Sequence, residues 1–230
     1  MIRKKTDSFT LIELLVVMAV IAILAGLILS VSGYATNKAA SSKAETEIAA
    51  LSAALESYKA DNGIYPSGPT TASSNPVIPA NATSTLDART SPPAVYTSAG
   101  WVSTDVYKNA SLFLYTQLSG DLNADGKVDA SDAALNNNVT PKTYFDFKPN
   151  MLMLSNGSIG SPSNPISSTN QVRAIADPWT FSYGYSTANQ ADSTKGYNPT
   201  FDLWCISKCT DTPTPTANPD KVTAKWIKNW

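Results

Sequence analysis

A short acidic stretch in the middle of the chain carries side chains suited to binding a cation. Residues 120–132 read Gly-Asp-Leu-Asn-Ala-Asp-Gly-Lys-Val-Asp-Ala-Ser-Asp. Counted from Asp121, oxygen donors fall at positions 1, 3, 5, 7, 9 and 12, and a glycine falls at position 6. The candidate ligands are the side chains of Asp121, Asn123, Asp125, Asp129 and Asp132 and the main-chain carbonyl of Lys127. Calcium takes about 6–8 oxygen ligands, and this spacing is typical of loops that wrap around it. The sequence therefore predicts a calcium site at 121–132; the alternative is a surface turn rich in Asp, Asn and Gly.

This loop departs from a standard EF-hand at its last position, where Asp132 replaces the usual Glu. It is similar in that respect to a dockerin-type loop, but dockerins carry two such loops and this chain has one. We therefore do not infer cohesin binding. Four carboxylates within twelve residues repel one another, and Lys127 is the only local cation. A bound cation would relieve that repulsion.

A second chemically unusual residue is Glu13, which lies inside an apolar run. Phe9–Val31 is 23 residues long and carries no other charge, while Arg3, Lys4 and Lys5 precede it. As a helix the run is ~34 Å long, enough to cross a bilayer. The basic cluster marks the cytoplasmic side, so the rest of the chain is expected outside. A carboxylate in such a helix is costly and needs a partner, and the run offers none. The alternatives are a plain signal anchor and a cleaved secretory signal, which is usually shorter.

This order of residues resembles the class III prepilin signal, in which a short basic leader precedes Phe-Thr-Leu-Ile-Glu. The resemblance implies cleavage between Ser8 and Phe9 by a prepilin peptidase and N-methylation of Phe9. It also implies that Glu13 pairs with the new N-terminal amine of a neighbouring subunit during assembly. Ser8 departs from the family, which usually has Gly before the cut.

The helix is expected to continue beyond the apolar run. Apolar residues recur at spacings of 4, 3, 4 and 3 and so form one stripe, made by Ala44, Ile48, Leu51, Leu55 and Tyr58. Asn62-Gly63 is a helix stop signal, with Pro66 just beyond. We therefore predict a leader at 1–8, a long helix at 9–61 with its transmembrane part at 9–31, and a head domain at 62–230.

Two further stretches are similar to type II secretion major pseudopilins. The first is the helix junction, carried by Tyr58, Asp61, Gly63, Tyr65 and Pro66. The second is the C-terminal sheet, where Asp-Pro-Trp at 177–179 opens one strand, Phe-Asp-Leu-Trp at 201–204 forms the next, and Ile227, Asn229 and Trp230 end the chain. The resemblance implies an α+β type IV pilin fold, a long helix packed on a head with a small antiparallel sheet. Such proteins bind calcium in their C-terminal β region, which makes Asp202 a second candidate ligand.

The remaining stretches carry weaker signals. Ser67–Trp101, rich in Pro, Ser and Thr, predicts a long surface loop; Ser111–Leu118 predicts a short buried helix; Tyr144–Leu154 predicts one or two strands. Cys205 and Cys209 are spaced to form a small-loop disulfide in an exported protein, with two free thiols as the alternative. The chain has no His and a net charge of −1, which excludes His-based catalysis and gives no basic surface for nucleic acid.

These features predict a structural subunit of a type IV filament rather than an enzyme. The filament expected is the pseudopilus of a type II secretion system, a helical homo-oligomer built with an inner-membrane assembly platform and minor pseudopilins. The subunit would wait in the bacterial inner membrane with its head in the periplasm before joining a periplasmic or extracellular filament. A surface type IV pilin for adhesion, motility or DNA uptake is the nearest alternative, and a membrane-anchored calcium-binding module is a more distant one.

Overall fold

The long helix is present as one continuous element, α1 (Leu11–Asn62). It ends at the predicted stop signal, because Gly63 adopts a left-handed conformation with φ of 78°. The N–H of Gly63 donates to the carbonyl of Lys59 at 2.7 Å, which satisfies one of the last carbonyls of the helix. A residue with a Cβ would be strained at this position.

The computed structural model describes residues 10–69, 71–74, 76–97, 100–207 and 223–230. By their internal contacts the residues fall into two units, Met1–Ala40 and Ser41–Trp230. The second half of α1 therefore belongs to the same unit as the head. Ser8 and Phe9, the predicted processing site, and Cys209, half of the predicted disulfide, lie outside the described residues.

The head is α+β, with short antiparallel sheets and few helices. Its helical elements are α2 (Asp105–Ser119), α3 (Ala130–Leu135), η1 (Pro149–Met151) and α4 (Ala188–Ala191). Its strands are β1 (Ser73–Ser74), β2 (Val77–Ile78), β3 (Ala94–Thr97), β4 (Gly100–Ser103), β5 (Leu152–Leu154), β6 (Val172–Ile175), β7 (Gly184–Ser186), β8 (Asp202–Cys205) and β9 (Ile227–Lys228). The strands pair as β1–β2, β3–β4, β5–β6 and a three-stranded sheet in the order β7–β8–β9.

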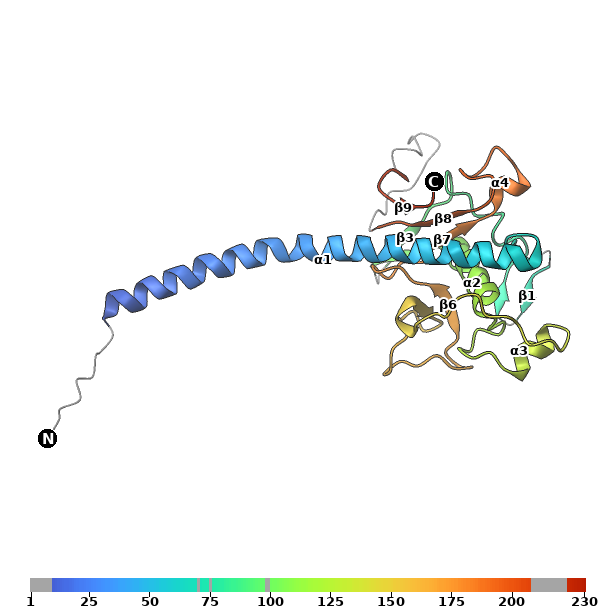
Figure 1. Ribbon diagram of the computed structural model, residues 1–230, viewed down its shortest axis with the longest axis horizontal. Helices are drawn as coiled ribbons and strands as arrows, with labels where there is room; N and C mark the ends of the chain where they lie inside the picture. Colours follow the sequence, from blue (N-terminus) through green and yellow to red (C-terminus); the bar gives the residue numbers. More distant parts are fainter. Residues whose placement is uncertain (1–9, 70, 75, 98–99, 208–222) are drawn as a thin grey trace. The chain divides into compact units, whose positions relative to one another are not determined.

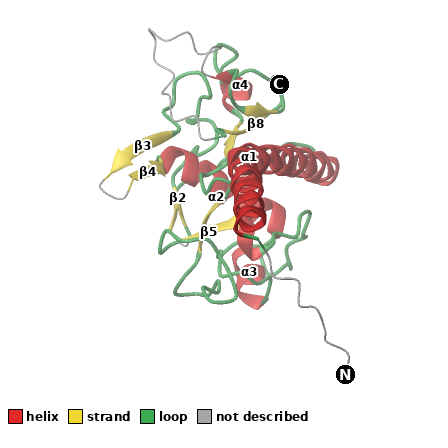
Figure 2. Cartoon of the chain, turned by 90° about the vertical axis from the view of Figure 1, so that its left-hand side faces the viewer, coloured by secondary structure: helices red, strands yellow, loops and turns green. Residues whose placement is uncertain are grey.

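The apolar stripe of α1 forms one side of the main core. Ala44, Leu51 and Leu55 are fully buried, and they share a cluster with residues of α2, β5, β6, β7 and β8. Within the head, β8 and β9 lie on one side of α1, and α3 lies on the other (Figure 1). Figure 2 shows the same division, with β8 and α4 on one side and α3 on the opposite one. Each buried Leu contributes about 1.5–3 kcal/mol, so this stripe alone anchors the helix firmly.

A second core cluster is built on Trp204, which is fully buried on β8. Its indole stacks on Trp226 with ring centroids 5.9 Å apart and donates from Nε1 to Tyr107 Oη at 3.3 Å. Gly184 faces Trp204 across the β7–β8 pair, and a Cβ there would come within 2.2 Å of the indole. Gly184 is therefore needed for the close approach of Trp204 to β7.

Several sequence expectations need correction. The segment 67–101 is not a plain surface loop, because it contains β1, β2 and β3 and buries Leu86 completely. The short helix expected at 111–118 begins earlier, at Asp105. The expectation of one or two strands in 144–154 is confirmed by one strand, β5, which follows the 3-10 turn η1 at Pro149. Asp177-Pro178-Trp179 does not open a strand but forms the turn between β6 and β7, while the predicted pairing of β7 with β8 is confirmed.

Candidate functional site

Glu13 closes the first turn of α1. Its Oε2 accepts hydrogen bonds from the backbone N and the hydroxyl of Thr10, both at 2.8 Å, and its own N–H faces Thr10 Oγ1 at 3.3 Å. This is a reciprocal capping box, and the Thr-x-x-Glu pattern at 10–13 is its sequence signature. Glu13 thus has a local structural role as well as the predicted assembly role.

The apolar residues that follow Glu13 are exposed on all sides of the helix. From Leu11 to Ile28 the large apolar side chains are between 49% and 83% exposed. In the part of the chain that the structure describes, α1 is the one helix long and apolar enough to cross a membrane. Side chains of this kind require cover by lipid or by other protein chains.

The predicted calcium loop begins where α2 ends. Gly120 terminates α2 in a left-handed conformation, and Asp121 follows it with its side chain buried. Oδ1 of Asp121 accepts from the N–H of Asp125 at 3.1 Å, and Oδ2 accepts from Tyr115 Oη at 2.6 Å and Gly126 N at 2.7 Å. Burial raises the pKa of Asp121 above its ordinary value, an effect that these hydrogen bonds only partly offset. Asp121 therefore organises the first half of the loop.

Asp132 organises the second half from the opposite end. Its side chain is fully buried, and its Oδ1 accepts from Leu122 N at 2.7 Å and Asn123 N at 3.1 Å. Its Oδ2 accepts from Asp129 N at 2.9 Å, while Asp129 in turn caps α3 by accepting from Ser131. The structure thus brings positions 1 and 12 of the predicted loop together through the backbone between them.

Gly126 is required at the sharp turn of the loop. It has φ of 89°, and a Cβ there would lie 2.7 Å from Cγ2 of Ile166. Neighbouring side chains also bind the turn, since Asn123 Oδ1 accepts from Asp125 N and Asp125 Oδ1 accepts from Lys127 N. The glycine predicted at position 6 therefore serves both the backbone conformation and the packing.

The donor set of this loop fits calcium in its chemistry. The six predicted ligands supply oxygen only, as a hard cation requires. No ion pair within the described residues reaches Asp121 or Asp132, although both carboxylates are buried. Each accepts three hydrogen bonds, which leaves about one of roughly four lone-pair positions free on each. Within the described residues no three Asp, Glu or Cys side chains already converge as a metal-binding group.

Asp202, the second candidate ligand, organises a different loop. Its Oδ2 accepts from Tyr197 N and its Oδ1 from Asn198 N, both at 2.8 Å. Gly196 stands next to it with φ of 63°, and a Cβ there would lie 2.7 Å from Asp202 Oδ2. The structure thus places Asp202 at the start of β8, with its carboxylate bound to backbone amides of the preceding turn.

The junction residues fasten the end of α1 to the head. Tyr58 Oη donates to Gln117 Oε1 at 3.0 Å, and Asp61 forms an ion pair with Lys142. Tyr65 is buried and donates to Glu56 Oε1 at 2.8 Å. These contacts explain physically why a Tyr, an acid and a second Tyr stand at these spacings.

A buried polar cluster under α1 was missed by the sequence analysis. Glu47 is only 8% exposed and accepts from Tyr183 Oη at 2.7 Å. Nearby, Cys205 Sγ donates to Asp177 Oδ2 at 3.1 Å, and burial raises the pKa of Asp177 to about 6. The spacing of Glu47, three residues after Ala44 and four before Leu51, was the available signal.

Comparison with known proteins adds a similarity for part of the chain. Residues 3–29 match the family described as the prokaryotic N-terminal methylation motif. The chain is 40% identical over 65 residues to the type II secretion system core protein G of Pseudomonas aeruginosa, which covers 28% of this chain and 46% of that protein. It is 42% identical over 63 residues to the protein of the same name from Vibrio cholerae, which covers 27% and 43%.

The matched region is short on both sides of these comparisons. The chain spans less than half the length of the curated relatives it matches, including the core protein G of Aeromonas hydrophila at 39% identity over 64 residues. No solved structure shows significant similarity to the chain. The matches to core protein G cover at most 28% of this chain, so most of the head has no counterpart in these comparisons.

Proposed function

We propose that this protein is a structural subunit of a type IV filament, the pseudopilus of a type II secretion system. One observation carries the proposal: a single helix exposes apolar side chains all round its first half and buries an apolar stripe in the head along its second half. A helix of that kind suits a subunit that waits in a membrane and then joins a bundle of equal helices. The methylation motif at 3–29 and the core protein G relatives support the same role.

In this account the chain acts by assembly and not by catalysis. A prepilin peptidase removes the leader at Ser8, and Phe9 becomes a methylated N-terminus in the inner membrane. The subunit, with its head in the periplasm, is then taken into the filament by an assembly platform, with minor pseudopilins as further partners. Glu13 pairs with the N-terminal amine of a neighbouring copy, because burying either charge without a partner among apolar helices is strongly unfavourable. A surface pilus remains the alternative filament.

The processing step is tested by mass spectrometry of assembled material. The N-terminal peptide is expected to begin at Phe9 and to carry one methyl group on its amine. Replacing Ser8 with Gly, the residue usual in the family, should leave that product unchanged or increase its yield. Assembled filaments that retain Met1 would contradict the proposal.

We also propose that the loop 121–132 binds one calcium ion and thereby stiffens the head. Asp121, Asn123, Asp125, Asp129 and Asp132 would hold it by side-chain oxygens and Lys127 by its carbonyl. When bound, the ion supplies positive charge that two buried, unpaired carboxylates otherwise lack. A ligand that binds only the folded state stabilises it by about 2.7 kcal/mol at a hundred times its dissociation constant.

A calcium titration of the detergent-solubilised chain, monitored by its melting temperature, tests this. Calcium added after chelation should raise the melting temperature of the wild type, and Asp125→Ala should remove most of the gain. Asp192→Asn is the matched control, since Asp192 is a partly exposed acid in another turn that also accepts from a following backbone amide. Equal calcium responses in the two variants, or none in the wild type, would leave the loop as a plain surface turn.

A further inference from the structure

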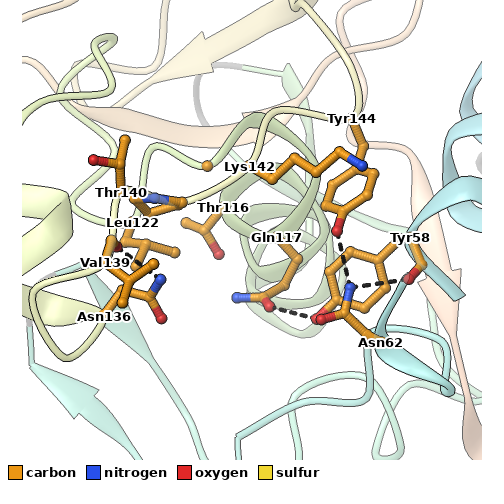
Figure 3. A pocket seen from close by; sticks show the side chains of 12 residues that line it. Tyr58, Asn62, Thr116, Gln117, Leu122, Asn136, Val139, Thr140, Lys142 and Tyr144 are labelled. Atoms are coloured by element: carbon orange, nitrogen blue, oxygen red, sulfur yellow. Dashed lines mark hydrogen bonds between the residues drawn. The ribbon is translucent and has the colours of Figure 1, made fainter. Parts of the chain in front are cut away.

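A separate pocket lies where the end of α1, α2 and the segment 136–144 meet (Figure 3). Its volume is about 280 Å³. Tyr58 and Asn62 enter it from α1, Gln117 enters from α2, and Tyr144 and Asn136 enter from the segment that follows α3. Neither the calcium loop ligands nor Glu13 line it, and the assembly role assigns it nothing.

The polar side chains of this pocket are held in fixed orientations. Gln117 Oε1 accepts from Tyr58 Oη at 3.0 Å, so the amide nitrogen of Gln117 is turned into the pocket toward Asn136 (Figure 3). That Nε2 donor makes no hydrogen bond within the described residues. Gln117 is thus an oriented donor whose hydrogen bond can be completed only by a ligand or by water. Because the amide is already held in place, little side-chain entropy is lost when a ligand binds.

Acceptors are fixed in the same way. Asn62 Nδ2 donates to the carbonyl of Tyr58 at 2.9 Å and to Tyr144 Oη at 3.0 Å, which leaves Asn62 Oδ1 as an acceptor. Asn136 Nδ2 donates to the carbonyl of Val139 at 2.9 Å, which likewise leaves its Oδ1. Donors and acceptors therefore stand in one pocket, an arrangement that matches hydroxyl groups, since each hydroxyl both donates and accepts.

The pocket offers no unpaired charge. Lys142 is the one cation among the lining residues, and it is already paired with Asp61. No carboxylate lines the pocket, so neither an anion nor a metal ion is matched by its chemistry. The rest of the lining includes apolar side chains, among them Leu122 and Pro141, and the rings of Tyr58 and Tyr144, whose centroids lie 5.1 Å apart. Two threonines, Thr116 and Thr140, also line it.

We propose that this pocket binds one ring of a neutral carbohydrate. A sugar ring combines hydroxyl groups at its rim with an apolar C–H face, which the aromatic wall and the oriented amides match together. The volume is near the lower end of small-molecule sites, about 300–1,000 Å³, so it suits a single ring and not an oligosaccharide. Tyr58 is a positioning residue here, because its hydroxyl sets the direction of the Gln117 amide.

Ligand-detected saturation-transfer NMR on the full chain tests the proposal. The chain is kept in a zwitterionic detergent without sugar head groups, and the probes are glucose, galactose and N-acetylglucosamine. At least one probe should bind saturably, and Gln117→Ala should weaken that binding about tenfold, the effect of losing one well-placed hydrogen bond. Tyr58→Phe should weaken it by less, because the Gln117 amide remains but is no longer held.

Gln190→Ala is the matched control, since Gln190 is an exposed amide that donates to Thr200 far from this pocket. It should bind the probes as the wild type does. Each variant is measured at the same number of degrees below its own melting temperature, so that differences in stability do not appear as differences in binding. Absence of saturable binding for every probe, or equal binding by Gln117→Ala and the wild type, would overturn the proposal. Tighter binding of glucose 6-phosphate than of glucose would overturn its claim that the ligand is neutral.

Discussion

The two halves of α1 share one backbone but treat their side chains in opposite ways. From Leu11 to Ile28 the large apolar side chains are exposed, whereas Ala44, Leu51 and Leu55 are fully buried in the head. The first half is apolar all round, so no single protein face can cover it; the second half confines its apolar residues to one stripe, which the head covers. The difference shows that the apolar residues of the second half are buried by the chain itself, whereas those of the first half need lipid or other protein chains to cover them.

The acids of the two halves follow the same division. Glu47 is buried and accepts from Tyr183, so its partner belongs to the chain itself. Glu13 is exposed, and within the described residues its carboxylate accepts hydrogen bonds only from Thr10 in the same turn. Glu47 thus completes a polar contact on folding, while the partner that we propose for Glu13 belongs to another copy of the chain.

The largest difference is expected from shortening one leucine in each half of α1. Leu51→Ala removes a fully buried side chain and should lower the free energy of unfolding of the head by about 2–5 kcal/mol. Leu15→Ala, in the exposed half, should leave it nearly unchanged. Chemical denaturation followed by tryptophan fluorescence in detergent measures both free energies. Equal losses would mean that the two halves of α1 contribute equally to the stability of the head.

Asp177 gives a pH-dependent effect of similar size. It faces Cys205, Glu47 and Tyr183, and burial raises its pKa to about 6 from an ordinary value near 3.8. Because the folded pKa is raised, its contribution to stability is fully present below about pH 4 and is lost as the pH rises through about 6, a change of about 3 kcal/mol at most.

Asp177→Asn keeps an acceptor for the N–H groups of Trp179 and Phe181 but cannot titrate. The stability of the wild type relative to this variant should therefore fall between about pH 4 and about pH 7. Denaturation midpoints of both proteins across that range measure the difference. A constant difference would mean that Asp177 does not titrate between these values.

A smaller effect is expected where the polar contact of α1 with the head is cut. Tyr183→Phe removes the hydroxyl that donates to Glu47 and leaves a buried carboxylate with one partner fewer, at a cost of about 1–3 kcal/mol. Tyr34→Phe is the control in the first half, since Tyr34 is 75% exposed. If both variants unfold at the same denaturant concentration as the wild type, Glu47 does not stabilise the head.

Much of α1 was predictable because its signals are local. The apolar run, the stripe from Ala44 to Tyr58 and the Gly63 stop follow from spacings within a few residues. The order of oxygen donors at 121–132 is equally local, and the backbone follows it: Asp121 and Asp132 receive the amides between them. Whether calcium completes this loop stays a prediction.

The rest depended on contacts between distant residues. The segment 67–101 looked structureless because β1 and β2 have two residues each, and its order comes from partners such as Thr187, whose hydroxyl contacts that of Thr83 at 2.8 Å. Glu47 meets Tyr183 only in the folded head, 136 residues further along the chain, so the spacing within α1 could not show its partner. The pocket at Gln117 likewise assembles from three segments that share no sequence motif.

The assembly contact proposed for Glu13 can be tested by separating the charge of this side chain from its capping role. Glu13→Gln keeps an acceptor for Thr10 but removes the charge, and Thr10→Val removes the hydroxyl of the cap but keeps the charge. Filament yield is measured by shearing and sedimentation at equal membrane levels of each variant. The proposed contact predicts loss of filaments in Glu13→Gln and retention in Thr10→Val. Normal filament yield from Glu13→Gln would contradict it.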